Sequence, residues 1–162
     1  TRSTYTHDSD FFKSSQIVLT DDSIIFFAST SLFSFNLFNG ALNWKHNIYS
    51  QNVPIIDGNN VFVVSNDGFF LNLDRKSGLI NWSVNTFKIL KETKQKTEAT
   101  GTVLASGKLY ITTKNGFLIE CSALTGKVLR FKKIGDNLVV PPVVSNGSLY
   151  LLTENSKIIG FN

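Results

Sequence analysis

The chain has few of the residues on which catalytic and metal sites are built. It contains one cysteine, two histidines and no methionine among 162 residues. Cys121 cannot form a disulfide within the chain, so cysteine usage does not distinguish a reducing from an oxidising compartment. Because Cys121 lies in the apolar run FLIECS, we expect a buried structural thiol and not a nucleophile. His7 and His46 lack the spacing of metal ligands.

Sequence motifs for catalysis or ion binding are also missing. The chain has no Gly-x-Ser-x-Gly elbow, phosphate-binding loop or zinc motif. Asp21 and Asp22 form an acidic pair, but they fall in a predicted turn without an EF-hand pattern, which is typical of a solvated turn. The sequence therefore predicts no catalytic, cofactor-binding or metal-binding residue. We expect no cofactor and no small-molecule substrate.

Arginine is scarce, and long apolar runs are absent. Arg2, Arg75 and Arg130 lie far apart, whereas a nucleic-acid reader is expected to cluster arginine with exposed aromatic residues. The sequence thus argues against a nucleic-acid-binding protein. The net charge of +4 suits an acidic partner or an anionic membrane surface, and equally a merely soluble surface. No transmembrane stretch or signal peptide is present, and we expect a processed or trimmed product.

What the chain does contain is strand-forming sequence. Fourteen phenylalanines and many short runs of isoleucine, valine and leucine favour a pleated, half-buried surface. Three hairpins align without a gap at residues 59–74, 107–122 and 147–162, and residues 22–36 match if one turn is shortened by one residue. One strand position then holds Ile25, Phe62, Tyr110 and Tyr150. Such recurrence is typical of stacked sheets, so we expect these side chains in the core.

A second landmark follows each hairpin. Gly40, Gly78 and Gly126 each stand four residues after a short polar residue, which describes a tight glycine turn before another apolar strand. Four antiparallel strands that recur about every 40 residues indicate propeller blades. We therefore predict an all-β partial β-propeller with three nearly complete blades and an incomplete fourth. A β-sandwich is the rival fold, but it would not predict this repetition.

The repeat also divides the chain. Residues 16–162 are predicted to form the blades, as one domain or as a fragment of a larger propeller, and residues 1–15 form an amino-terminal segment that is mobile or completes a blade. Residues 86–99 interrupt the repeat with a polar, lysine-rich stretch, which predicts a projecting loop with room for a helical turn. Its lysines are a candidate partner-binding site, although a merely solvated loop explains them as well. They are Lys88, Lys91, Lys94 and Lys96.

The phrases LDRKSGLINW and SALTGKVLRF resemble the signature of the pyrroloquinoline-quinone (PQQ) repeat, a β-propeller family. Trp44 and Trp82 match its tryptophan, and the resemblance implies that both pack between adjacent blades. The third copy departs from the signature, because Arg130 stands where tryptophan is expected. Propellers of this family commonly have more blades than this sequence supplies. The resemblance therefore implies that further blades of a longer protein, or a second chain, complete the ring.

The resemblance implies three functions. The first is a non-catalytic, BamB-like scaffold, a periplasmic lipoprotein at the outer membrane that binds the β-barrel assembly machinery. The second is a fragment of a PQQ-dependent quinoprotein dehydrogenase, but those enzymes use adjacent cysteines and this chain has a single one. The third is a lumenal or extracytoplasmic sensor domain. The missing cofactor residues favour the non-catalytic scaffold.

Overall fold

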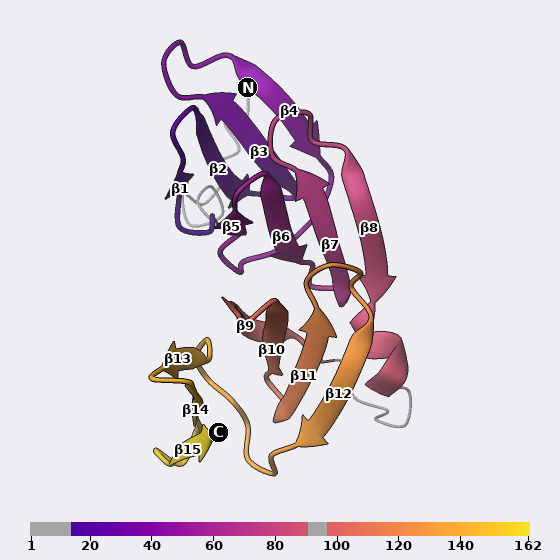
Figure 1. Cartoon of the computed structure of the whole chain (residues 1–162), viewed down its shortest axis with the longest axis vertical. Helices are drawn as coiled ribbons and strands as arrows, with labels where there is room; N and C mark the ends of the chain where they lie inside the picture. The colour runs from indigo at the N-terminus through magenta and orange to yellow at the C-terminus, as the bar shows by residue number, and fades with distance from the viewer. Residues whose placement is uncertain (1–13, 91–96) are drawn as a thin grey trace, which may run out of the picture.

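The computed structural model describes residues 14–90 and 97–162, which form strands and one short 3₁₀ helix (Figure 1). The strands make four antiparallel sheets that follow one another along the chain. Sheet 1 contains β1 (Val18–Leu19), β2 (Ser23–Ala28), β3 (Ser31–Asn36) and β4 (Leu42–His46). Sheet 2 contains β5 (Ile55–Asp57), β6 (Asn60–Val64), β7 (Phe69–Asp74) and β8 (Ile80–Asn85).

The second half of the chain repeats this plan. Sheet 3 contains β9 (Ala99–Ala105), β10 (Lys108–Thr113), β11 (Phe117–Ser122) and β12 (Val128–Lys133). Sheet 4 contains β13 (Val143–Ser145), β14 (Ser148–Leu152) and β15 (Ile158–Phe161). Three sheets thus have four strands and the fourth has three, which confirms the predicted all-β fold of three nearly complete blades and an incomplete one.

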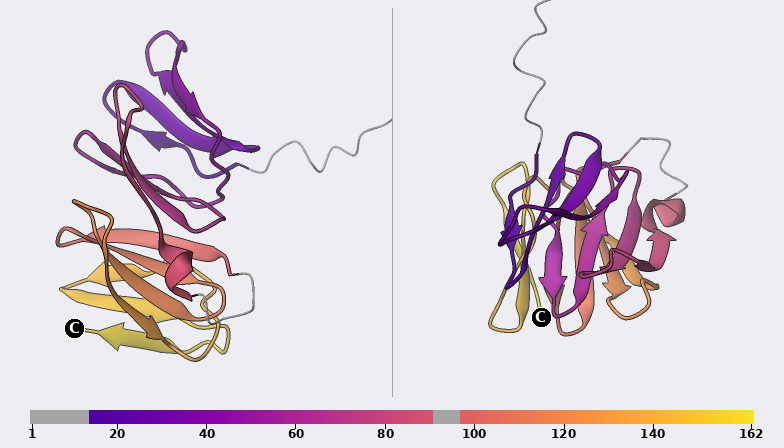
Figure 2. Two further views of the ribbon diagram at one scale, coloured as in Figure 1. Left: turned by 90° about the vertical axis from the view of Figure 1, so that its right-hand side faces the viewer. Right: turned by 90° about the horizontal axis from the view of Figure 1, so that it is seen from above.

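Consecutive sheets stack face to face, in their order along the chain (Figure 2). We call the face toward the next sheet the leading face, and the face toward the preceding sheet the trailing face. Junction 1/2 buries Ile25, Phe27, Leu32 and Trp44 of one leading face against Val61, Val63, Leu71 and Leu73. Junction 2/3 buries Phe62, Val64 and Phe70 against Leu109, Ile111, Ile119 and Cys121, and junction 3/4 buries Leu118 against Leu149 and Leu151. Each fully buried side chain of this kind contributes roughly 1.5 to 3 kcal/mol.

The recurrent strand position noted in the sequence lies on the leading faces. Ile25 and Phe62 are buried as expected, and Tyr110 is partly buried against sheet 4. Tyr150 differs from the expectation, since it is 40% exposed. The reason is that no sheet of the described chain lies against the leading face of sheet 4.

The glycine turns join the third and fourth strands of sheets 1 to 3. Gly40, Gly78 and Gly126 have φ of +68°, +74° and +70°, in the left-handed region that side chains rarely adopt. Each turn is followed by a register shift in the strand pair, a recurrent β-bulge. The fourth strand of each of these sheets begins two residues after its glycine, at Leu42, Ile80 and Val128.

The lysine-rich interruption begins with the 3₁₀ helix η2 (Thr86–Leu90) directly after β8. Thr86 is fully buried, and its backbone N–H and its hydroxyl both donate to the carbonyl oxygen of Gly68, at 2.8 and 2.9 Å. These bonds fix the start of the excursion to the β6–β7 turn. At the amino-terminal end, the N–H of Ser15 donates to the carbonyl oxygen of Phe27 at 3.0 Å, so that this segment continues the pairing along β2.

Candidate functional site

Trp44 lies in the junction between sheets 1 and 2. Its side chain is buried, and its Nε1–H donates to the backbone carbonyl of Arg75 at 2.8 Å. The ring packs on the glycine turn of sheet 2, because a Cβ built on Gly78 would lie 2.6 Å from Trp44 Cγ. His46 Nε2 lies 2.7 Å from the carbonyl oxygen of Gly78. Trp44 therefore joins two sheets through both apolar contact and a hydrogen bond.

Trp82 occupies the same place in the next junction. A Cβ on Gly126 would lie 2.6 Å from Trp82 Cε3, and the indole packs edge-on against Phe70 with ring centroids 4.8 Å apart. Unlike Trp44, the Nε1 atom of Trp82 is buried without a hydrogen-bond partner in the described part of the chain. This junction thus keeps the contact between ring and glycine but lacks the hydrogen bond.

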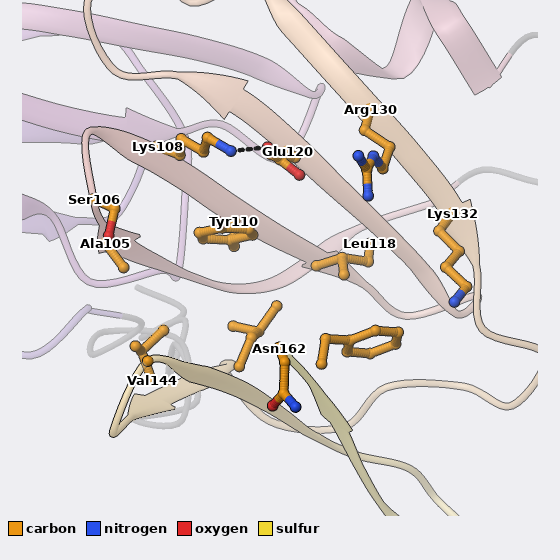
Figure 3. A pocket seen from close by; sticks show the side chains of 13 residues that line it. Ala105, Ser106, Lys108, Tyr110, Leu118, Glu120, Arg130, Lys132, Val144 and Asn162 are labelled. Carbon is orange, nitrogen blue, oxygen red and sulfur yellow. Dashed lines mark ion pairs between the residues drawn. The ribbon is translucent and has the colours of Figure 1, made fainter.

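Arg130 stands at the corresponding position of the third junction. The register pairs Ser34 with Trp44, Asn72 with Trp82 and Glu120 with Arg130. Instead of a packed indole, a cleft of about 480 Å³ opens between sheets 3 and 4 (Figure 3). Its lining combines apolar walls with charged groups, among them Lys108, Tyr110, Leu118, Glu120, Arg130, Lys132, Leu149 and Phe161.

The cleft carries more positive than negative charge. Lys108 Nζ and Glu120 Oε1 form an ion pair at 2.7 Å, and this hydrogen bond to Glu120 is the main cause that raises the pKa of Lys108. Arg130 and Lys132 form no ion pair with the residues that the structure describes. Lys132 Nζ lies 4.6 Å from the centroid of the Phe161 ring. The cleft is therefore suited to an anionic group with an apolar body, whereas it offers no nucleophile activated by a neighbouring base.

The structure also places the other candidate residues. Cys121 is fully buried, and burial, with a smaller effect of Glu120, raises the pKa of its thiol to about 12. Asp22 forms an ion pair with Arg75 that bridges sheets 1 and 2, an interaction the sequence pattern did not reveal. Within residues 14–90 and 97–162 no three His, Cys, Asp or Glu side chains gather as metal ligands. The same residues contain no helix long and apolar enough to cross a membrane.

Of the four lysines predicted to bind a partner, the structure describes one. Lys88 lies in η2 and is exposed. Its backbone N–H donates to Asn85 Oδ1 at 3.0 Å, which holds this turn of helix against the end of β8. Lys91, Lys94 and Lys96 fall outside the described residues. That this loop binds a partner remains a prediction.

Comparison with known proteins links this geometry to a family. The family model described as outer membrane protein assembly factor BamB matches residues 9–84. BamB of Legionella pneumophila (strain Paris) is 26% identical over 124 residues, which cover 76% of this chain and 30% of that protein. An uncharacterized protein of Rickettsia prowazekii (strain Madrid E) is 30% identical over 115 residues, or 68% of this chain and 27% of the relative. The chain thus spans about 30% of the length of these relatives.

Solved structures share the fold at low sequence identity. BamB from Moraxella catarrhalis matches with a TM-score of 0.73 and 16% identity, over 90% of this chain and 42% of that chain. The computationally designed Ika4 protein matches with a TM-score of 0.72 and 14% identity, over 98% and 94% of the two chains. A quinohemoprotein alcohol dehydrogenase of Pseudomonas putida HK5 matches with a TM-score of 0.72 and 16% identity, over 89% and 28%.

These matches and the stacked antiparallel sheets define a protein of the β-propeller class. Trp44 and Trp82, which match the tryptophan of the PQQ repeat in sequence, pack on the glycine turns at Gly78 and Gly126. Together, the family model, the relatives and the shared fold support the PQQ-repeat family for this chain.

Proposed function

We propose that this chain is part of a non-catalytic, BamB-like protein-interaction scaffold that assists the assembly of outer-membrane β-barrel proteins. The observation that carries the proposal is the sequence similarity to an outer membrane protein assembly factor over 124 residues. The proposal places the protein in the periplasm as a lipoprotein associated with the outer membrane. Its partners are other proteins, among them the β-barrel assembly machinery.

The chemistry of the described side chains supports a scaffold. The two tryptophans are used in packing between sheets, and the thiol of Cys121 is fully buried with a raised pKa. What the chain exposes instead are loops on rigid sheets, together with the cleft beside Arg130. Loops on a rigid scaffold are the usual location of binding residues.

The second candidate is a fragment of a quinoprotein dehydrogenase. It is favoured by the structural match to the alcohol dehydrogenase of Pseudomonas putida HK5, which at 16% identity concerns the fold alone. The residues present do not fit the PQQ and calcium centre that the resemblance implies for such enzymes. The chain has one cysteine where those enzymes use an adjacent pair, and the described residues offer no cluster of acidic ligands. We therefore derive no catalytic step.

Two binding measurements separate the candidates. The purified chain is immobilised, and purified β-barrel assembly machinery is passed over it; the scaffold proposal predicts saturable binding. In parallel, PQQ with calcium is titrated into the chain while tryptophan fluorescence is recorded, and the proposal predicts no saturable quenching. Binding of PQQ without binding of the assembly machinery would reverse the assignment.

A further inference from the structure

Asparagine followed by glycine occurs three times in the sequence, at Asn39, Asn115 and Asn146. This dipeptide is prone to spontaneous loss of the asparagine amide, because glycine has no side chain to hinder attack of its own backbone nitrogen on the preceding side chain. The three pairs lie in the turns between β3 and β4, between β10 and β11, and between β13 and β14. Their dipeptide is the same, so their surroundings decide which of them reacts.

Hydrogen bonds hold the first pair, in the glycine turn of sheet 1. The N–H of Gly40 donates to the carbonyl oxygen of Asn36 at 3.0 Å. Asn39 Oδ1 accepts the N–H of Ala41 at 2.9 Å. Both the attacking nitrogen and the side-chain amide must therefore leave a hydrogen bond before they can react.

The second pair, in the turn of sheet 3 between β10 and β11, is held in the same way. The N–H of Gly116 donates to the carbonyl oxygen of Thr113 at 2.9 Å, and Asn115 Oδ1 accepts the Thr113 hydroxyl at 3.0 Å. The main chain also packs closely on this turn, since a Cβ built on Gly116 would lie 2.3 Å from the carbonyl oxygen of Asp136. This turn has little room to rearrange.

The turn between β13 and β14 leaves the third pair without such bonds. Asn146 and Gly147 are exposed, and their φ values of +49° and +77° are those that the two central residues of a type I′ turn require. They link Ser145 to Ser148, which pair across the hairpin. Among the described residues, neither the N–H of Gly147 nor the side-chain amide of Asn146 makes a hydrogen bond.

The accessible N–H of Gly147 is a property of this kind of turn. The corresponding turns of sheets 2 and 3 belong to sheets that pack against a neighbour on both faces, and their central residues Gly58, Asn59, Ser106 and Gly107 are nevertheless exposed. In those turns too, the N–H at the position of Gly147 donates to no residue that the structure describes. Stacking of sheets therefore does not cover the nitrogen that has to attack.

We propose that Asn146 is a site of spontaneous deamidation in the folded chain. Hydroxide removes the proton from the N–H of Gly147, and the nitrogen attacks Cγ of Asn146. The bond between this nitrogen and Cγ forms and the bond between Cγ and Nδ2 breaks, so that Nδ2 takes a proton from water and leaves as ammonia. Water then opens the resulting succinimide ring at either carbonyl carbon and gives aspartate or isoaspartate. The net reaction consumes one water and releases one ammonia, with no change of oxidation state.

Either product changes the edge of the cleft between sheets 3 and 4. Gly147 lines this cleft together with Lys108 and Arg130, so the new carboxylate adds a negative charge beside a positively charged lining. Isoaspartate also adds one carbon to the main chain between Ser145 and Ser148, whose pairing depends on the length of the turn. The modification should therefore weaken the attraction of the cleft for anions, and the isoaspartate form should also loosen the hairpin.

Peptide mapping of the aged chain tests the proposal. The 162-residue chain is kept folded at pH 8, and mass spectrometry after proteolysis follows the conversion of each of the three amides to an acid. Asn146 should convert at least about tenfold faster than Asn39 or Asn115, because those two sites must first break hydrogen bonds. The same dipeptide at Asn39 and Asn115 supplies matched controls in the same sample. Equal conversion at Asn146 and at either control would overturn the proposal.

Denaturation of the chain provides the second comparison. In guanidinium chloride the three Asn-Gly pairs lose their fixed hydrogen bonds, so their rates should become similar. Folding should thus slow Asn39 and Asn115 strongly and Asn146 little; if folding slows Asn146 as much as the other two, the type I′ turn protects it and the proposal is wrong.

A variant links the product to this one site. Isoaspartate methyltransferase, which labels isoaspartate, should label the aged folded chain. Asn146→Gln has a longer side chain that closes the corresponding ring poorly, and this variant should lose most of the label. Circular dichroism checks that the variant is folded, and a folded variant that keeps the label would place the reaction elsewhere.

Discussion

The Nε1 atom of Trp44 donates a hydrogen bond to the carbonyl oxygen of Arg75 across the junction between sheets 1 and 2, over 2.8 Å. The equivalent atom of Trp82 is buried in the next junction without a partner among the described residues. The two tryptophans pack on equivalent glycine turns, at Gly78 and Gly126. Both tryptophans thus keep the contact between the indole ring and a glycine, but only Trp44 also makes a hydrogen bond across its junction.

We predict that replacing each tryptophan by phenylalanine has unequal effects. Trp44→Phe leaves the Arg75 carbonyl without its donor and should cost about 1 to 3 kcal/mol beyond the smaller ring. Trp82→Phe loses no hydrogen bond and removes a buried unpaired donor, so it should cost less. Urea denaturation gives both free energies of unfolding. Equal losses would mean that the bond to Arg75 contributes nothing.

Removal of the whole indole tests packing alone. We expect Trp82→Ala to destabilise the chain by roughly 3 to 5 kcal/mol, because a large side chain between two sheets is replaced by a cavity. The measurement is again urea denaturation. A loss below about 1 kcal/mol would show that Trp82 does not hold the sheets together.

The three turn glycines provide a third prediction with its own control. Each has positive φ, so alanine at any of them should cost about 1 to 2 kcal/mol in backbone strain. Gly40 has open space around its Cα, whereas a Cβ at Gly78 or Gly126 would lie 2.6 Å from an indole carbon. Gly78→Ala and Gly126→Ala should therefore lose clearly more stability than Gly40→Ala. Equal losses would assign the whole effect to φ.

The glycine turns and the hairpin repeat could be read from the sequence because both are local. A turn with positive φ selects glycine, and a strand buried on both faces, such as β6, selects a nearly continuous run of apolar residues. The ion pair between Asp22 and Arg75 could not be read in this way. It joins residues 53 positions apart, and nothing in the sequence near either residue indicates which turn of the neighbouring sheet it faces.

The exposure of Tyr150 is a second feature that the local sequence could not predict. Its position in the repeat predicts burial, but burial depends on whether another sheet lies against that face. The cleft beside Arg130 was indicated only by the missing tryptophan. Its charge comes from Lys108, Glu120 and Lys132 on three adjacent strands, whose convergence depends on strand register.

The lysine-rich loop carries a prediction about the proposed partner. Reversal of Lys88, Lys91, Lys94 and Lys96 to glutamate should weaken binding to the β-barrel assembly machinery if the loop contacts it. The control reverses four exposed lysines elsewhere, namely Lys45, Lys76, Lys127 and Lys157. Surface plasmon resonance compares the two variants at equal net charge. The same affinity for both variants would mean that the loop is solvated and does not contact the assembly machinery.

Cys121 should be unreactive in the folded chain. Burial is the main cause that raises its thiol pKa to about 12, and the thiolate is the reactive form. At pH 8 we expect 5,5′-dithiobis(2-nitrobenzoate) to label the native chain far more slowly than the chain in urea. Rapid labelling under native conditions would show that the junction between sheets 2 and 3 opens readily.

The lowered pKa of Asp74 predicts that the folded chain loses stability in acid. The backbone N–H of Ser77 is the largest of the hydrogen-bond donors that hold the pKa of Asp74 below its ordinary value of 3.8, and the Ser77 hydroxyl and the N–H of Lys76 act in the same direction. Because the folded pKa is the lower one, the ionised carboxylate stabilises the folded chain above about pH 4, and this stabilisation is lost as the pH falls through the folded pKa.

Asp74→Asn removes this titration while it keeps an oxygen acceptor in the turn. Between pH 6 and about pH 3, the urea midpoint of the unmodified chain should therefore fall further than that of Asp74→Asn. Asp21→Asn is the control, because Asp21 is exposed and accepts no hydrogen bond from the described residues; its midpoint should follow that of the unmodified chain. A parallel fall in all three proteins would mean that the turn around Gly78 does not depend on the charge of Asp74. In that case, the packing of this turn against Trp44 would depend on Gly78 and not on the charge of Asp74.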